Sequence, residues 1–129
     1  MSAEQIQPVI ESYFSEISRM NGEGWVQNFA GDAIVCDPVG KPPMKIHEEF
    51  EKFFAIITRF YDSLEVTPEE IFIAGNGAAV KWKMKVAAKN GKQGIAEGIG
   101  VFEFNDEGKI QKLSSYWDEA KLLAQISDR

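Results

Sequence analysis

Three side chains that could take part in proton transfer are spread over almost the whole sequence. Asp37 ends an apolar run within VCDPVGKPP at residues 35–43, and Pro38 follows it directly. A carboxylate there costs free energy unless it is solvated, paired or put to use. Tyr13 and Trp117 carry a phenol O–H and an indole N–H, both hydrogen-bond donors. If the fold brings them together, one proton acceptor and two donors would share a pocket.

A first helix carrying Tyr13 is predicted by apolar side chains at helical spacing. These side chains are Ile6, Val9, Ile10, Tyr13, Phe14 and Ile17. Because proline cannot donate the amide hydrogen bond of a helix interior, we expect the regular part to start near Pro8 and to end at residues 21–24. A short helix over residues 25–29 and a longer one over residues 44–57 are also predicted, with a strand at residues 33–37 between them.

The rest of the sequence is rich in β-strand patterns. The predicted strands cover residues 62–66, 70–74, 79–88, 93–105 and 109–117, and a last short helix begins near Asp118. Helices followed by an antiparallel meander are typical of an α+β domain with its helices on one face of a curved sheet. The length fits a single hydrophobic core, so we expect one domain over residues 1–129.

The hairpin around Gly91 decides which strand residues point inward. Residues 80–86, VKWKMKV, place lysines on one face and apolar side chains, including Trp82, on the other. A two-residue turn would put the lysines on the same face as Gly98 and Gly100. A three-residue loop with Gly91 left-handed would instead set Trp82 opposite Gly98. We prefer the second register, because it lets an indole fill the space above a glycine.

Strand alternation also decides where Asp37 points. Asp37 shares a face with Val35, so its side chain is directed into the core or its mouth, where Tyr13 and Trp117 could meet it. Two simpler interpretations stay open. Asp37 could cap the turn before Pro38, and Tyr13 could be a core aromatic with a satisfied hydroxyl.

Several stretches around these residues resemble the ketosteroid isomerases, within the wider nuclear transport factor 2-like (NTF2-like), SnoaL-like fold. The resemblance is carried by SYFSEI around Tyr13 and by FAGDAIVCDPVGKPP, EFEKFF, GVFEFNDEGKIQ and SSYWDEAKL. The spacing from Tyr13 to Asp37 is that of the family. The resemblance implies an α+β cone, in which N-terminal helices pack on a curved mixed or antiparallel sheet and enclose an apolar pocket.

The same resemblance implies a role for each of the three side chains. Asp37 matches the general base that takes a proton next to a carbonyl and returns it further along the conjugated system. Tyr13 matches the phenol that donates a hydrogen bond to the dienolate oxygen, and Trp117 matches the indole that bonds the base. Gly100 stands where the family has a protonated acid as second donor, and losing one such donor typically lowers the rate by about 100- to 1000-fold.

Further residues are expected to line the pocket with these three. They are Phe54, Trp82, Met84, Gly100, Phe102 and Ser115. Whether the protein is an enzyme stays open, because Gly100 removes a donor and because this fold serves many functions. The alternatives are a noncatalytic domain that binds a small molecule in the same cone, and a protein-interaction module that uses the outer face of the sheet.

Composition restricts the partners. Acidic residues outnumber basic ones by 20 to 14, which opposes binding to nucleic acid or to an anionic membrane surface. No apolar stretch approaches a membrane span and the N-terminus is not a signal peptide, so we expect a cytoplasmic protein. Cys36 and His47 are the only residues of their kinds, which leaves no basis for a disulfide or a cysteine cluster. We therefore expect no metal and no cofactor.

A small apolar ligand is the expected partner. A homodimer through the outer sheet face is a further hypothesis. Ile99 and Val101 on that face favour association, whereas the lysines at positions 81, 83 and 85 favour a polar or partial interface.

Overall fold

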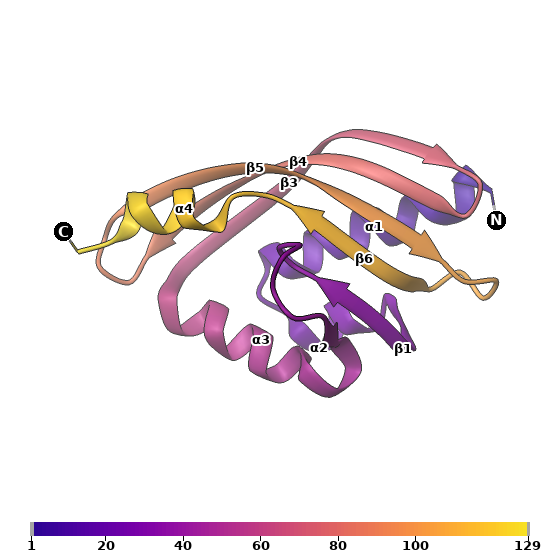
Figure 1. Cartoon of the computed structure of the whole chain (residues 1–129), viewed down its shortest axis with the longest axis horizontal. Helices are drawn as coiled ribbons and strands as arrows, with labels where there is room; N and C mark the ends of the chain where they lie inside the picture. Colours follow the sequence, from indigo (N-terminus) through magenta and orange to yellow (C-terminus); the bar gives the residue numbers. More distant parts are fainter. Residues whose placement is uncertain (1, 129) are drawn as a thin grey trace.

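Most of the sheet is one antiparallel meander that follows the third helix. In the computed structural model, which describes residues 2–128, its strands are β3 (Tyr61–Ala74), β4 (Gly77–Ala88), β5 (Gln93–Phe104) and β6 (Ile110–Tyr116). The parallel strand β1 (Phe29–Cys36) joins the free side of β6, and the short β2 (Met44–Lys45) pairs with β1. The six-stranded order is β2-β1-β6-β5-β4-β3, and this curved mixed sheet confirms the predicted α+β fold (Figure 1).

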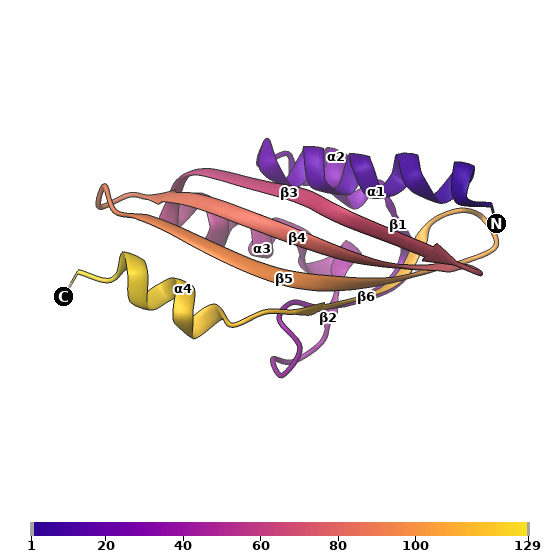
Figure 2. The same cartoon turned by 90° about the horizontal axis from the view of Figure 1, so that it is seen from above.

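The helices lie beneath the concave side of the sheet and along its sides. They are α1 (Ala3–Ser18), α2 (Gly22–Val26), α3 (Ile46–Phe60) and α4 (Glu119–Ile126). Figure 1 shows α2 and α3 under the sheet, and Figure 2 shows α1 along β3 and α4 beyond β5 on the other side. None of the helices described is long and apolar enough to cross a membrane.

The core forms where the apolar face of α1 meets the inward side chains of the strands. The buried residues of α1 are Ile6, Ile10, Tyr13, Phe14 and Ile17. Strand β4 alternates buried and more exposed side chains along its length, so Trp82 and Met84 point inward and the lysines outward. The apolar residues of α1 predicted from helical spacing are therefore the ones that pack, with Val9 only partly buried.

Two predicted boundaries near the N-terminus are wrong. Helix α1 begins at Ala3, because Ser2 and Gln5 form a capping box that starts the helix ahead of Pro8 and leaves the proline inside it. Phe29 opens strand β1 instead of closing the second helix, and Asp37 lies just beyond the end of that strand.

The two strands predicted at residues 62–66 and 70–74 form one strand, β3. Pro68 lies inside it, next to a register shift between Pro68 and Glu70. This is possible because β3 is the edge of the sheet, where a missing amide hydrogen leaves no neighbouring strand unpaired.

The hairpin between β4 and β5 has the preferred three-residue loop. Ala88 donates its N–H to the carbonyl oxygen of Lys92 at 2.8 Å, and Gly91 has a φ of 86°. Trp82 consequently pairs with Gly98 across the two strands. A Cβ added to Gly98 would lie 2.6 Å from both Cζ2 of Trp82 and the carbonyl oxygen of Tyr116, so the glycine is required by the indole above it.

We therefore expect Gly98→Ala to lower the free energy of unfolding by about 2–3 kcal/mol, because the added methyl group overlaps a packed indole and backbone. Urea denaturation followed by tryptophan fluorescence measures this change. Gly31→Ala is the matched control, because no atom of the described residues, apart from its own chain neighbours, lies within 4 Å of its added Cβ, and its effect should stay within about 0.5 kcal/mol. Equal stabilities of the two variants would contradict the packing described for Trp82.

Candidate functional site

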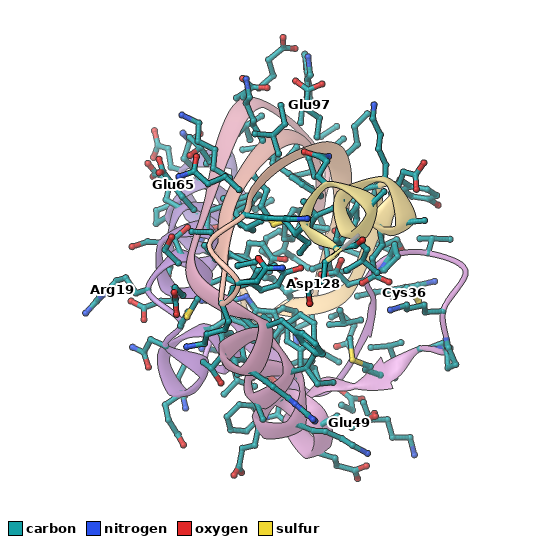
Figure 3. The ribbon with its side chains drawn as sticks, turned by 90° about the vertical axis from the view of Figure 1, so that its left-hand side faces the viewer. Arg19, Cys36, Glu49, Glu65, Glu97 and Asp128 are labelled. Carbon is teal, nitrogen blue, oxygen red and sulfur yellow. The ribbon has the colours of Figure 1, made fainter. Side chains whose placement is uncertain are left out.

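A cavity of about 820 Å³ lies between the inner face of the sheet and helices α1, α3 and α4. This volume suits a small organic ligand, for which pockets commonly measure about 300–1,000 Å³. Its wall is mostly apolar, and the exposed side chains of Phe60 and Leu123 belong to it as well. Figure 3 views the molecule from the end with the hairpin and α4, where Asp128 lies near the centre of the view, between the sheet and α3.

Asp37 and Trp117 are joined by a hydrogen bond at the cavity wall. Strand β1 pairs in parallel with β6 up to Cys36 and Ser114, so Asp37 enters the cavity beside the end of β6. The indole Nε1–H of Trp117 donates to Oδ1 of Asp37 at 2.8 Å. Within residues 2–128 no backbone N–H donates to this carboxylate, so the structure does not support Asp37 as a cap of the turn before Pro38.

Burial makes Asp37 a stronger base than an ordinary aspartate. Loss of solvent raises its pKa from 3.8 to about 6; the hydrogen bond from Trp117 and the positive charge of Lys41 oppose this rise, and the negative charge of Glu119 adds to it. The carboxylate is still mostly ionised at neutral pH, yet it binds a proton more readily than a solvated one. A pKa near the working pH is what general base catalysis requires.

Tyr13 lies at the cavity within a cluster of aromatic rings. Its ring contacts those of Phe14, Trp25, Phe29 and Phe102, with centroid distances of 4.9 to 6.1 Å. Burial, followed by the charge of Asp37, raises the pKa of the phenol well above its ordinary value, so it stays protonated. The hydroxyl has no hydrogen-bond partner among the described residues, although the residue is only 5% exposed. A ligand oxygen in the cavity would supply that partner.

Six of the nine predicted site residues line the cavity. They are Tyr13, Asp37, Trp82, Met84, Ser115 and Trp117. The other three do not line it and instead support its wall. Phe54 packs edge-on against Trp25 at 5.2 Å, and Phe102 packs edge-on against Tyr13 at 5.1 Å. Gly100 is covered by Phe102, whose Cε1 would lie 3.1 Å from an added Cβ, so an aromatic ring fills the space of the missing acid.

The mouth of the cavity contains residues that sequence reasoning missed. Helix α4 contributes Glu119, Leu123 and Ile126 to the wall, and Glu119 forms an ion pair with Lys41. The close spacing of Leu122, Leu123 and Ile126 gives this short helix apolar side chains on more than one face. This pattern indicates that the helix contacts both the sheet and a second apolar surface. Leu122 and Ile126 pack over Gly94 of β5, which leaves Leu123 for the cavity.

The cysteine and the histidine lie away from any metal-binding arrangement. Within residues 2–128, no group of three or more His, Cys, Asp or Glu side chains could hold a metal ion. Cys36 is a partly buried free thiol. Nε2 of the exposed His47 lies 2.9 Å from the carbonyl oxygen of Phe29 and donates to it.

A curved sheet closed by helices around an apolar cavity, with an acid, a phenol and an indole in its wall, is the architecture of an NTF2-like domain. The sequence agrees with this class. The family model of the SnoaL-like domain matches residues 10–113, so the chain belongs to the SnoaL-like family.

Solved structures of the same fold cover nearly the whole chain. An NTF2-like protein of unknown function from Burkholderia pseudomallei is 19% identical, with a TM-score of 0.83 over 98% of this chain and 99% of that one. SalBIII, an epoxide hydrolase/cyclase-like enzyme in pyran ring formation in polyether salinomycin, is 21% identical, with a TM-score of 0.80 over 94% and 97%. TerC, co-crystallised with polyporic acid, is 14% identical, with a TM-score of 0.83 over 96% and 99%. At these identities the similarity shows the fold alone.

Proposed function

We propose that the protein binds a small apolar carbonyl compound and catalyses an intramolecular proton transfer of the ketosteroid isomerase type, with Asp37 as the base. One observation carries the proposal. The Asp37 carboxylate, held by Trp117, lines the same apolar cavity as the hydroxyl of Tyr13, which has no partner among residues 2–128. Two structures of this fold support a small organic ligand. SalBIII acts in pyran ring formation, and TerC was co-crystallised with polyporic acid.

In the proposed reaction Asp37 takes a proton from the carbon between a carbonyl group and an isolated double bond. The C–H electron pair moves into the dienolate, and the phenol of Tyr13 donates a hydrogen bond to the oxygen as negative charge develops there. Asp37 then returns the same proton to the far carbon of the conjugated system, which yields the conjugated enone and restores the carboxylate. Trp117 occupies Oδ1 and leaves Oδ2 to carry the proton.

The conversion can be followed by the ultraviolet absorbance of the product. The assay uses β,γ-unsaturated ketones of increasing size, from a cyclohexenone to a 3-ketosteroid, and records the conjugated enone that forms. We expect turnover with at least one of these compounds. A folded protein that neither turns over nor binds any of them would contradict the proposal.

The rate should depend on the ionisation of Asp37. Because the base must be deprotonated and its pKa is raised to about 6, kcat/KM should be level above this pH and fall about tenfold per pH unit below it. Initial rates measured between about pH 4 and pH 8 test this, with the absorbance of the protein's own aromatic side chains as a check on folding. A flat profile across that interval would contradict Asp37 as the base.

A second candidate is binding without catalysis. The observation that favours it is the ring of Phe102 over Gly100, which excludes a second acidic donor from the place expected for it. In that case the ketones would bind with measurable affinity while no enone formed.

A further inference from the structure

Ser115 is a buried polar side chain that the proton transfer described above does not use. It is 2% exposed, it belongs to the wall of the cavity, and its hydroxyl has no hydrogen-bond partner among residues 2–128. Among residues 2–128, the side-chain polar atom that is fully buried without a partner is Nε1 of Trp25, so Oγ of Ser115 keeps some accessible surface. The hydroxyl is therefore open to the cavity and available to a ligand.

Sheet register places Ser115 between the base and the position of the missing acid. Ser115 pairs directly with Gly100 on β5. On its other side, the parallel pairing of Cys36 with Ser114 brings the next residues of the two strands, Asp37 and Ser115, side by side. Neighbouring strands lie about 4.8 Å apart. The backbone of Ser115 is therefore about one strand spacing from that of Gly100 on one side and from the end of β1 at Asp37 on the other.

The neighbouring polar groups leave this hydroxyl free for a ligand. Among residues 2–128, the only side-chain hydrogen bond to the carboxylate of Asp37 comes from Trp117, two residues after Ser115 and just beyond the end of β6. Gly100 has no side chain to cover Ser115, and the ring of Phe102 lies against Gly100 and Tyr13. Tyr13 and Ser115 thus line one cavity from different elements, and neither hydroxyl has a hydrogen-bond partner within residues 2–128.

We propose that Ser115 Oγ–H is the second hydrogen-bond donor to the carbonyl oxygen of the substrate, acting beside Tyr13 in place of the acid that is absent at position 100. The inference rests on the proposed function, since it assigns a further residue to the same substrate oxygen. A serine hydroxyl is small and neutral, so it fits a site whose remaining space is occupied by Phe102. It donates less strongly than a carboxylic acid, so it stabilises the developing charge on the substrate oxygen less than the acid would.

The test uses a bound ketone, so that it does not depend on turnover. The probe is 2-acetylnaphthalene with ¹³C at the carbonyl, and the measurements are its Kd and its isotope-edited infrared carbonyl band. Each donor lowers the carbonyl frequency. We expect Ser115→Ala to raise the frequency and to weaken binding about fivefold, as for one lost hydrogen bond, whereas Ser115→Thr keeps both values near those of the wild type.

Two further measurements separate a donor from a packing residue. In the enone assay Ser115→Ala should lower kcat by about 10- to 100-fold and leave the inflection of the pH profile in place. The effects of Ser115→Ala and Tyr13→Phe should be non-additive, because both donors serve one oxygen. Ser114→Ala is the matched control, since Ser114 pairs with Val101 and faces the opposite side of the sheet.

The possible failures are distinguishable. If Ser115→Ala binds the ketone with the wild-type frequency and Kd while Tyr13→Phe alters both, the assignment of Ser115 is wrong and the proposed function stands. If the folded wild type neither binds the probe nor forms enone, the proposed function fails and the role of Ser115 fails with it.

Discussion

Asp37→Asn is expected to lower kcat for enone formation by about 10³- to 10⁴-fold, because the amide cannot accept the transferred proton. The substitution keeps the shape of the side chain, and an asparagine oxygen can still accept the hydrogen bond from Nε1 of Trp117. The measurement is the initial rate of absorbance change at saturating ketone. Asp32→Asn is the matched control, since it makes the same chemical change at an exposed position of β1, and its kcat should equal that of the wild type.

The same variant should be more stable than the wild type at neutral pH. The pKa of Asp37 rises from 3.8 to about 6 on folding, so the folded protein binds the proton more tightly than the unfolded chain. The stabilisation from protonation is complete below about pH 4 and is lost as the pH rises through about 6. Above that pH the partly buried charge costs about 1–3 kcal/mol, which asparagine avoids.

Urea denaturation at about pH 4 and about pH 8 measures this difference. We expect the free energy of unfolding of Asp37→Asn to exceed that of the wild type at about pH 8 and to approach it at about pH 4. A variant less stable than the wild type at both pH values would show that the carboxylate is structural. Loss of turnover with a gain in stability is the combination expected of a functional group kept in a costly position.

Tyr13→Phe is expected to lower kcat by about 10²- to 10³-fold, the usual effect of removing one donor to a developing oxyanion. KM should change little, because the ring and its aromatic contacts remain. The hydroxyl has no partner within the described chain, so the melting temperature should stay within about 3 °C of the wild type.

Steady-state kinetics and thermal unfolding measure these quantities, and Tyr116→Phe is the matched control. Tyr116 loses the same atom, but it is 54% exposed and pairs with Ile99 outside the cavity. Equal kcat values for Tyr13→Phe and the wild type would remove the phenol from the reaction and favour Tyr13 as a core aromatic.

Local patterns in the sequence predict the parts of the fold that depend on neighbouring residues. The alternation of residues 80–86 and the loop around Gly91 are enough to set Trp82 over Gly98. The predicted break between residues 66 and 70 is wrong, because a local rule cannot tell that β3 is an edge strand that tolerates Pro68. The parallel pairing of β1 with β6 joins segments about eighty residues apart in the sequence, and only this pairing shows that Asp37 lies next to Ser115.

The lining of the cavity was less predictable than the strands that carry it. Alternation correctly makes Phe102 an inward, buried residue. It does not say that the ring turns onto Gly100 and Tyr13 and so becomes a support for the cavity wall. Helix α4 was predicted near its observed start, but its place at the mouth depends on packing against Gly94 of β5.

The position of α4 links the proton affinity of Asp37 to the docking of this helix at the cavity mouth. Its docking is held by Leu122 and Ile126 over Gly94 and by the side-chain amide of Asn90, which donates to the carbonyl oxygen of Ile126. The helix also brings Glu119, whose charge adds to the rise in the pKa of Asp37. Undocking α4 would admit water and withdraw that charge, and both changes lower the pKa. By reciprocity, the protonation of Asp37 and the docking of α4 favour each other.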